Sequence, residues 1–402
     1  MTSAIIITIC TLLLVAYIFD LTASLTRIPA VLLMLVVGFL VRKTAEVFNI
    51  QIPNLNGLLP ILGSLGLILI VLEGALELEF NQSKLKLIRK SFLGSLIPIA
   101  AFSFLFAYII MLESGVGYRQ ALINAIPFSV ISSSIAIPSV RTQSKEVREF
   151  VIYESSFADI LGILFFNFFA INSSINLNSF GNFGLELLMM ALISFVATVG
   201  LALLLSKIDH HVKFAPIVIL VILVYEISKE YNLPALIFIL LFGLFLGNLD
   251  ELKRFRIIQK LNPMNLNEQI FKFREIVTEA AFIVRALFFL LFGYLMKASE
   301  ILNTETFLWS GGIVAGIYLL RVLILRMFKM KISPLLFVAP RGLINILLFL
   351  SITAEQSISF INRAVVIQVI FLTSLVLMIG MVFSKSTNSE EQQELKEEPY
   401  LI

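Results

Sequence analysis

Long apolar runs recur along almost the whole chain, separated by short stretches that contain charged residues, Gly, Pro or Asn. Each run approaches the roughly 20 residues that a helix needs to cross a hydrocarbon layer of about 30 Å. Breaking the chain at these interruptions predicts thirteen membrane-spanning helices, at residues 3–19, 28–41, 57–76, 91–112, 120–140, 149–170, 185–206, 214–228, 233–249, 275–296, 308–325, 332–354 and 364–384. The pattern therefore predicts an all-α polytopic membrane protein.

The positions of Lys and Arg provide an independent test of this count, because cytoplasmic loops carry an excess of both residues. Of the 30 Lys and Arg, 21 fall in the odd-numbered loops and the C-terminal tail, and 6 fall in the even-numbered loops. The other three, Arg285, Arg321 and Arg341, lie inside predicted helices. The alternation predicts an external N-terminus and a cytoplasmic C-terminus, and we expect a plasma membrane of the bacterial inner-membrane type.

Composition and net charge exclude several classes of protein. The chain is 59% hydrophobic and 14% charged, against roughly 45–50% and about 25% in soluble domains, which excludes a soluble enzyme and a disordered protein. The net charge of +3 is too small to favour nucleic acid as a partner. We find no nucleophile–base pair or metal-ligand cluster in the sequence, so we expect neither enzyme activity nor a cofactor.

Residues 1–384 form the predicted membrane domain, and residues 385–402 form a short acidic cytoplasmic tail. The pair His210 and His211 beside Asp209 is typical of an ordinary polar loop, although such a pair can also sense pH or bind metal.

Ionisable residues inside membrane helices are costly and tend to mark ion pathways. The sixth predicted helix carries two of them, Glu154 and Asp159. Ser155 and Asp159 lie four residues apart and share one helix face, whereas Glu154 points about 140° away from Asp159. Because desolvation disfavours a charged carboxylate, Asp159 is a candidate site for exchanging a proton against a small cation. The alternative is a paired carboxylate that only locks helices together.

Glu154 needs a partner of opposite charge, and Arg321 in the eleventh predicted helix is the candidate. Arginine stays protonated and can neutralise a buried carboxylate through a two-pronged contact. This pair is predicted to be structural.

Two predicted helices carry interruptions. The fifth contains Ser132, Ser133 and Ser134 shortly before Pro138, and the twelfth contains Pro340-Arg341-Gly342. Proline frees a backbone carbonyl one turn back, and broken helices at membrane depth are tolerated where they line a cavity or pack against protein. The interruptions stand seven helices apart, as in two inverted six-helix repeats joined by the seventh helix. Such paired breaks point to a transporter binding site.

Together, these motifs resemble the sodium/proton exchangers (NhaP/NHE-like) of the monovalent cation:proton antiporter superfamily. Glu154-Ser155 through Asp159 resembles the acidic signature of the sixth helix in that family, and Arg321-Val322-Leu323 resembles the eleventh-helix arginine. Pro340-Arg341-Gly342-Leu343 is similar to the charged motif of the twelfth helix. The Gly-Leu-rich third helix and Glu279 in the tenth helix also match the family pattern.

The resemblance implies a homodimer within the lipid bilayer, in which spans 1–3 and 8–10 form the dimerisation part. It also implies a moving core of spans 4–6 and 11–13, with crossed discontinuous helices 5 and 12, and span 7 as linker. By this resemblance, Asp159 binds the transported Na⁺ and H⁺ in competition during elevator-type alternating access. Ser155, with Ser132 and Ser133 of the broken fifth helix, would add oxygen ligands. Arg341 would supply the charge of the twelfth helix.

The chain departs from this family at two positions near the site. Ala158 stands where the family usually has Asn, and Ser132-Ser133-Ser134 stands where it usually has a Thr-Asp-Pro run. With one aspartate left in the core, the simplest exchange is one monovalent cation (Na⁺ or Li⁺, then K⁺) for one proton, which is electroneutral. A sodium-coupled organic-anion symporter of similar architecture and a transport-silent membrane sensor stay open as alternatives.

Overall fold

The computed structural model describes residues 2–26, 28–49, 55, 57–78, 82–172, 176–207, 214–231, 235–248 and 263–383. Within these ranges the regular structure is helical, and no strand occurs. The His210–His211 pair with Asp209 and the acidic tail at 385–402 lie outside the described residues.

Apolar runs form helices in lipid because a helix satisfies its own backbone hydrogen bonds. The first half of the chain forms α1 Thr2–Thr26, α2 Ala30–Val47, α3 Leu58–Glu77, the 3₁₀ helix η1 Gln82–Lys84, α4 Leu85–Ser114, α5 Tyr118–Ser129, α6 Ser133–Ser139 and α7 Lys145–Ile171. The second half forms α8 Leu177–Lys207, α9 Phe214–Glu230, α10 Leu236–Gly247, α13 Pro263–Leu295, α14 Ala298–Ile301, α15 Thr304–Met327, α16 Leu343–Leu350 and α17 Arg363–Phe383.

Helices lie within all thirteen predicted segments. Nine helical segments of the described chain are long and apolar enough to cross a membrane. The protein is therefore a multi-pass membrane protein, and the count of thirteen crossings stays a prediction.

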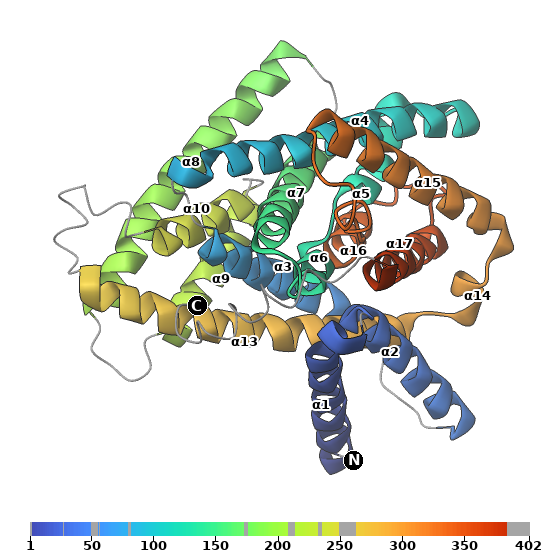
Figure 1. Cartoon of the computed structure of the whole chain (residues 1–402), viewed down its shortest axis with the longest axis horizontal. Coiled ribbons are helices and arrows are strands. Elements are labelled where there is room, and N and C mark those ends of the chain that lie inside the picture. Colours follow the sequence, from blue (N-terminus) through green and yellow to red (C-terminus); the bar gives the residue numbers. More distant parts are fainter. Residues whose placement is uncertain are drawn as a thin grey trace.

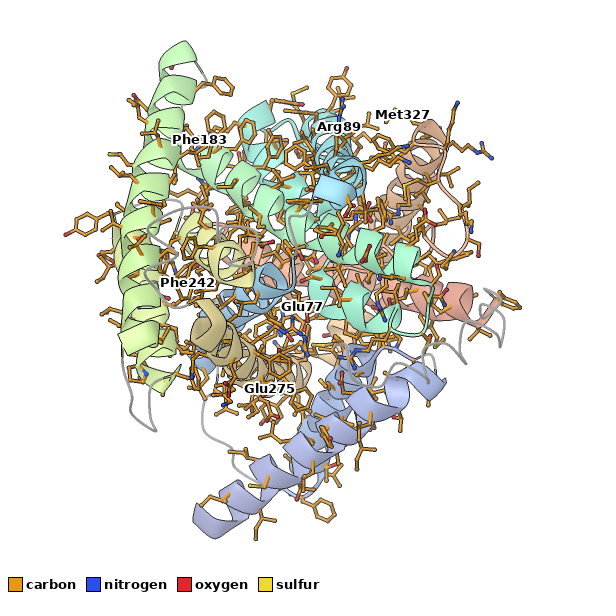
Figure 2. All side chains as sticks on the ribbon, turned by 60° about the vertical axis from the view of Figure 1, so that its left-hand side comes forward. Glu77, Arg89, Phe183, Phe242, Glu275 and Met327 are labelled. Atoms are coloured by element: carbon orange, nitrogen blue, oxygen red, sulfur yellow. The ribbon has the colours of Figure 1, made fainter. Side chains whose placement is uncertain are left out.

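The broken segments lie at the centre of the bundle, and long helices surround them. Figure 1 shows α5, α6 and α16 together in the middle, with α13 along one side and α8 and α15 along two others. The apolar window of α1 is only 6% buried within the chain, which is typical of a helix that faces lipid. On α8, Phe183 packs against α7, its ring centroid 5.0 Å from that of Phe168 (Figure 2).

Two glycines bring α2 and α13 into direct backbone contact. A Cβ atom added at Gly38 would lie 2.2 Å from the carbonyl oxygen of Leu290, and one added at Gly293 would lie 2.3 Å from that of Leu35. Small residues permit this approach, which stabilises helix pairs in membranes where no hydrophobic force drives helices together.

The predicted interruption of the fifth helix is present. Helix α5 ends at Ser129, and residues 130–132 are non-helical before α6 begins at Ser133. Val130 and Ser132 have ψ angles of 127° and 117°, which are extended values. The backbone groups that a continuous helix would hydrogen-bond at residues 130–132 therefore need other partners inside the bundle.

The twelfth predicted segment differs from expectation. Residues 328–342 form turns and irregular chain, and the helix begins only with α16 at Leu343. Pro334 and Pro340 explain the difference, because proline removes a backbone donor and disfavours helical conformation in the residue before it. The prediction of a helix on both sides of this break is therefore wrong for its N-terminal side.

Candidate functional site

Helix α7 positions both acidic residues that the sequence singled out. Glu154 is 1% exposed and Asp159 is 5% exposed. Among the described residues, they are the two acidic side chains that are buried to this degree. Their five-residue separation points them toward different neighbours, and these neighbours give the two carboxylates different chemistry.

Glu154 and Arg321 form a buried ion pair. The Nη1 and Nη2 atoms of Arg321 donate to Oε1 and Oε2 of Glu154, the second at 2.8 Å. Arg321 also donates from Nε to the Leu335 carbonyl at 3.1 Å and from Nη2 to the Val338 carbonyl at 3.2 Å. The guanidinium therefore neutralises a carboxylate and also holds the irregular chain before α16.

Asp159 lies at the break of the fifth helix and has no ion-pair partner within the described part of the chain. Its Oδ2 atom accepts a hydrogen bond from the hydroxyl of Ser133, the first residue of α6. Its Oδ1 atom is buried without a hydrogen-bond partner in the described structure. An unpaired carboxylate oxygen in such surroundings is costly unless a proton or a cation neutralises it.

A small cavity adjoins this carboxylate. Asp159, Ser133 and Ser156 supply its polar lining, and its volume is about 10 Å³. Ile70, Val71, Gly74 and Ala75 of α3 line it together with Ile160 and Leu240. Space of this size accommodates about one water molecule or one dehydrated ion.

Arg341 and Asn345 satisfy the carbonyls that the broken fifth helix leaves open. Arg341 donates from Nε to the Phe128 carbonyl at 2.8 Å and from Nη2 to that of Ser129 at 3.3 Å. Asn345 donates from Nδ2 to the carbonyls of Pro127 at 2.6 Å and Val130 at 2.8 Å.

The two breaks also touch through backbone, because the Ser132 N–H donates to the Pro340 carbonyl at 3.0 Å. Each interrupted segment therefore supplies hydrogen-bond partners for the other, which is how irregular chain is tolerated at membrane depth.

Ser132 and Ser155, the two other serines predicted to bind the cation, form no hydrogen bond with Asp159 in the described structure. The hydroxyls of Ser132 and Ser134 lie 2.9 Å apart. The hydroxyl of Ser155 donates to the Val151 carbonyl at 2.7 Å, four residues back on its own helix.

Sequence reasoning missed Ser156 and Asn345. The sequence did contain a signal for Asn345, because it is a polar amide in an apolar run, three residues after Gly342. In the structure its Oδ1 accepts a hydrogen bond from the Gly342 N–H at 2.6 Å. Nothing in the sequence separated Ser156 from Ser155.

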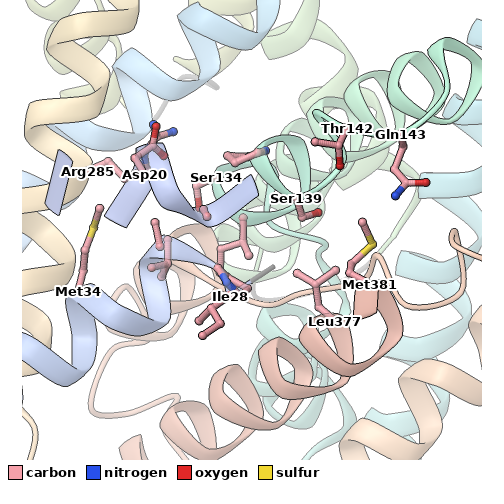
Figure 3. Close-up of a pocket in the computed structure, with 16 residues that line it drawn as sticks. Asp20, Ile28, Met34, Ser134, Ser139, Thr142, Gln143, Arg285, Leu377 and Met381 are labelled. Carbon is pink, nitrogen blue, oxygen red and sulfur yellow. The ribbon is translucent and has the colours of Figure 1, made fainter. Parts of the chain in front are cut away.

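Two larger cavities approach the site from opposite ends of α7. One of about 280 Å³ is lined by Asp20, Ser134, Gln143 and Arg285, and it reaches the connection that precedes α7 (Figure 3). The other, of about 140 Å³, is lined by residues that include Asn167 near the end of α7. Asp159 lies between these two ends of the helix, and Ser134, next to Ser133, lines the larger cavity.

An ion pair bridges α1 and the connection between α6 and α7 near the larger cavity. Arg141 Nη1 lies 3.3 Å from Asp20 Oδ2, and Asp20 itself lines the cavity. Arg285, also in the lining, lies 3.9 Å from Glu73 of α3. Two charged residues, Asp20 and Arg285, therefore line the cavity that also contacts Ser134 of α6.

Comparison with known proteins agrees with this architecture. The chain is similar to a structure of the sodium proton antiporter MjNhaP1 from Methanocaldococcus jannaschii at pH 8, with 17% identity and a TM-score of 0.63 over 94% of this chain and 95% of that one. A second structure of MjNhaP1, from an electron-microscopy map, is 20% identical, with a TM-score of 0.64 over 100% of both chains. These likenesses show a shared fold.

No curated protein sequence matches the chain. The family model described as "Sodium/hydrogen exchanger, transmembrane" matches residues 9–386, which is nearly the whole chain. The protein therefore belongs to the transmembrane sodium/hydrogen exchanger family.

Proposed function

We propose that the protein is a secondary active antiporter that exchanges one monovalent cation for one proton at Asp159. The observation that carries this proposal is a buried carboxylate with one oxygen bonded to Ser133 and the other unpartnered in the described structure. Such a group binds either H⁺ or a small cation, and competition between the two couples their movements. Na⁺ and Li⁺ are the first candidate cations, and K⁺ is the third.

The arrangement of cavities supports alternating access. Spaces of about 280 and 140 Å³ approach Asp159 from opposite ends of α7, while the space beside the carboxylate itself is about 10 Å³. The small space suits one ion and is too small for an organic anion. We assign the movement to an elevator-like shift of predicted spans 4–6 and 11–13 against spans 1–3 and 8–10, with span 7 as the linker.

In this proposal Ser133, Ser132 and Ser155 contribute oxygen atoms around the cation, and Glu154 with Arg321 keeps the core folded. The exchanger works as a homodimer in the plasma membrane, with the N-terminus outside and the C-terminus in the cytoplasm. No cofactor takes part, because the carboxylate carries both ions itself.

The decisive experiment measures cation-driven proton flux in reconstituted vesicles. Asp159→Asn keeps the size of the side chain and removes the group that titrates, so exchange should fall to the level of empty vesicles. Glu113→Gln neutralises an exposed carboxylate at the end of α4 and should retain the wild-type rate. Full flux in Asp159→Asn would refute the site.

Competition between H⁺ and Na⁺ for Asp159 also predicts how the apparent KM for Na⁺ changes with pH. Protons occupy Asp159 more often as pH falls, so the apparent KM for Na⁺ should rise at lower pH. An apparent KM that stayed constant across the range in which the transport rate changes would contradict a shared site.

A further inference from the structure

Ser156 on α7 has a buried hydroxyl group without an assigned role. The residue is 7% exposed, and its Oγ has no hydrogen-bond partner among the described residues. Serines in helices commonly donate to the carbonyl four residues back, as Ser155 does with Val151. Because buried polar atoms normally have a hydrogen-bond partner, a buried hydroxyl without this intrahelical bond is expected to bind another group.

Asp159 Oδ1, nearby on α7, is also a buried oxygen atom without a hydrogen-bond partner in the described structure. Ser156 and Asp159 are three residues apart, so they share a helix face, and both line the cavity of about 10 Å³. Two buried oxygen atoms therefore border one small space, and neither has a partner in the described structure. One occupant of that space would satisfy both.

The wall of α3 leaves the Ser156 hydroxyl uncovered. A Cβ atom added at Gly74 would lie 3.1 Å from Ser156 Oγ. The other α3 residues in the lining, Ile70, Val71 and Ala75, are apolar and offer no side-chain hydrogen bond. The occupant must therefore be bound by the oxygen atoms of α6 and α7.

We propose that Ser156 Oγ is a ligand of the transported cation and binds it together with Asp159 Oδ1. The inference rests on the cation/proton exchange proposed above and adds a further ligand on α7 beside Asp159 and Ser155. A hydroxyl oxygen has two lone pairs, and hard cations prefer oxygen ligands. Ser156 thus contributes to cation affinity, while Asp159 alone exchanges the proton.

Direct binding separates this role from a structural one. We would measure ²²Na⁺ binding to the detergent-solubilised protein at alkaline pH, and Na⁺-driven proton flux in vesicles. Ser156→Ala removes one unpartnered hydroxyl and little volume, so the protein should fold normally. We expect the Kd and the KM for Na⁺ to rise about tenfold, with the maximal rate unchanged. A tenfold change corresponds to about 1.4 kcal/mol.

Two further variants complete the design. Ser103→Ala on α4 removes another buried hydroxyl without a partner in the described structure, outside the cavity lining, and should leave Kd and KM unchanged. Gly74→Ala covers the Ser156 hydroxyl from the α3 side and should raise Kd in the same direction as Ser156→Ala.

The outcomes distinguish the two proposals. A Ser156→Ala protein with wild-type Kd and KM would overturn the ligand assignment alone, provided that the wild type exchanges and Asp159→Asn does not. Absence of sodium binding to the wild type, or full activity of Asp159→Asn, would overturn the exchange proposal and the ligand assignment with it.

Discussion

At the scale of single residues, the Glu154–Arg321 pair is the most buried ion pair that the structure describes. Both side chains are at most 3% exposed, and the guanidinium serves two backbone carbonyls besides the carboxylate. Removing one partner of such a pair leaves a buried charge without compensation, at a cost of about 3–5 kcal/mol.

Arg321→Ala should therefore lower the folded yield and the thermal midpoint of the purified protein. The double variant Glu154→Leu with Arg321→Met removes both charges and should recover part of the loss. Recovery stays incomplete because the Leu335 and Val338 carbonyls lose their donor. Lys272→Ala breaks an exposed pair with Glu268 and should cost less than about 1 kcal/mol. Equal yields for all four proteins would refute the buried pair as a stabilising contact.

The sequence identified Asp159, Glu154 and Arg321 because charged groups stand out in apolar runs. It could not tell which serine meets the carboxylate. That choice depends on how α6 is rotated against α7, and the structure selects Ser133 rather than Ser132 or Ser155. Ser155 and Ser156 look alike in sequence, and only the side-chain conformation shows which hydroxyl is already bonded to its own helix.

At the scale of elements, α2 and α13 depend on backbone contact at Gly38 and Gly293. Gly293→Ala places a methyl group 2.3 Å from the Leu35 carbonyl oxygen, so the helices must separate. Overpacking of this kind costs about 1–3 kcal/mol. Gly312→Ala on α15 adds the same methyl group where no atom lies within 4 Å.

We expect a lower thermal midpoint in detergent for Gly293→Ala and an unchanged one for Gly312→Ala. Scanning fluorimetry on the two purified variants would measure the difference. A Gly293→Ala protein as stable as the wild type would mean that the α2–α13 contact is not tight in solution.

Prediction of elements from sequence succeeded where the apolar pattern is long and regular. It predicted a break of the fifth helix at Ser132–Ser134 before Pro138, and the non-helical residues 130–132 begin just before these serines. It failed for residues 332–342, where hydrophobic composition suggested a helix but the chain is irregular. Arg321 of the preceding helix α15 stabilises that segment by donating to two of its carbonyls. The hydrophobic pattern of the segment itself does not indicate such hydrogen bonds.

At the scale of the whole molecule, the proposed charge balance of each transport cycle rests on the number of buried acidic side chains without an ion-pair partner. Asp159 is the buried acidic side chain without an ion-pair partner in the described structure, which is why we propose that one proton exchanges for one cation. The arrangement of helices around it could not be read from sequence, because packing in lipid depends on close approaches such as those at Gly38 and Gly293.

An electroneutral cycle predicts that membrane voltage leaves the rate unchanged. In vesicles clamped with valinomycin at 0 and −100 mV, Na⁺-driven proton flux should be equal. Net movement of one charge would be coupled to about 2.3 kcal/mol at 100 mV, a factor of roughly fifty at equilibrium. A rate that followed the voltage would indicate a second proton and a further titrating group.

The hydrogen bonds between the two interrupted segments restrict how the segments can move relative to each other. Arg341 and Asn345 hold carbonyls of the fifth-helix break, and Ser132 holds that of Pro340. If one segment slid past the other, these buried carbonyls would lose their hydrogen-bond donors, at a cost in free energy. We therefore expect the two segments to move together as one rigid block during the proposed transport cycle. We expect the sliding contact to lie between α3 and α7, where Gly74 presents no side chain to Ser156. A disulfide engineered between α5 and α16 should leave transport intact, whereas one engineered between α3 and α7 should arrest it.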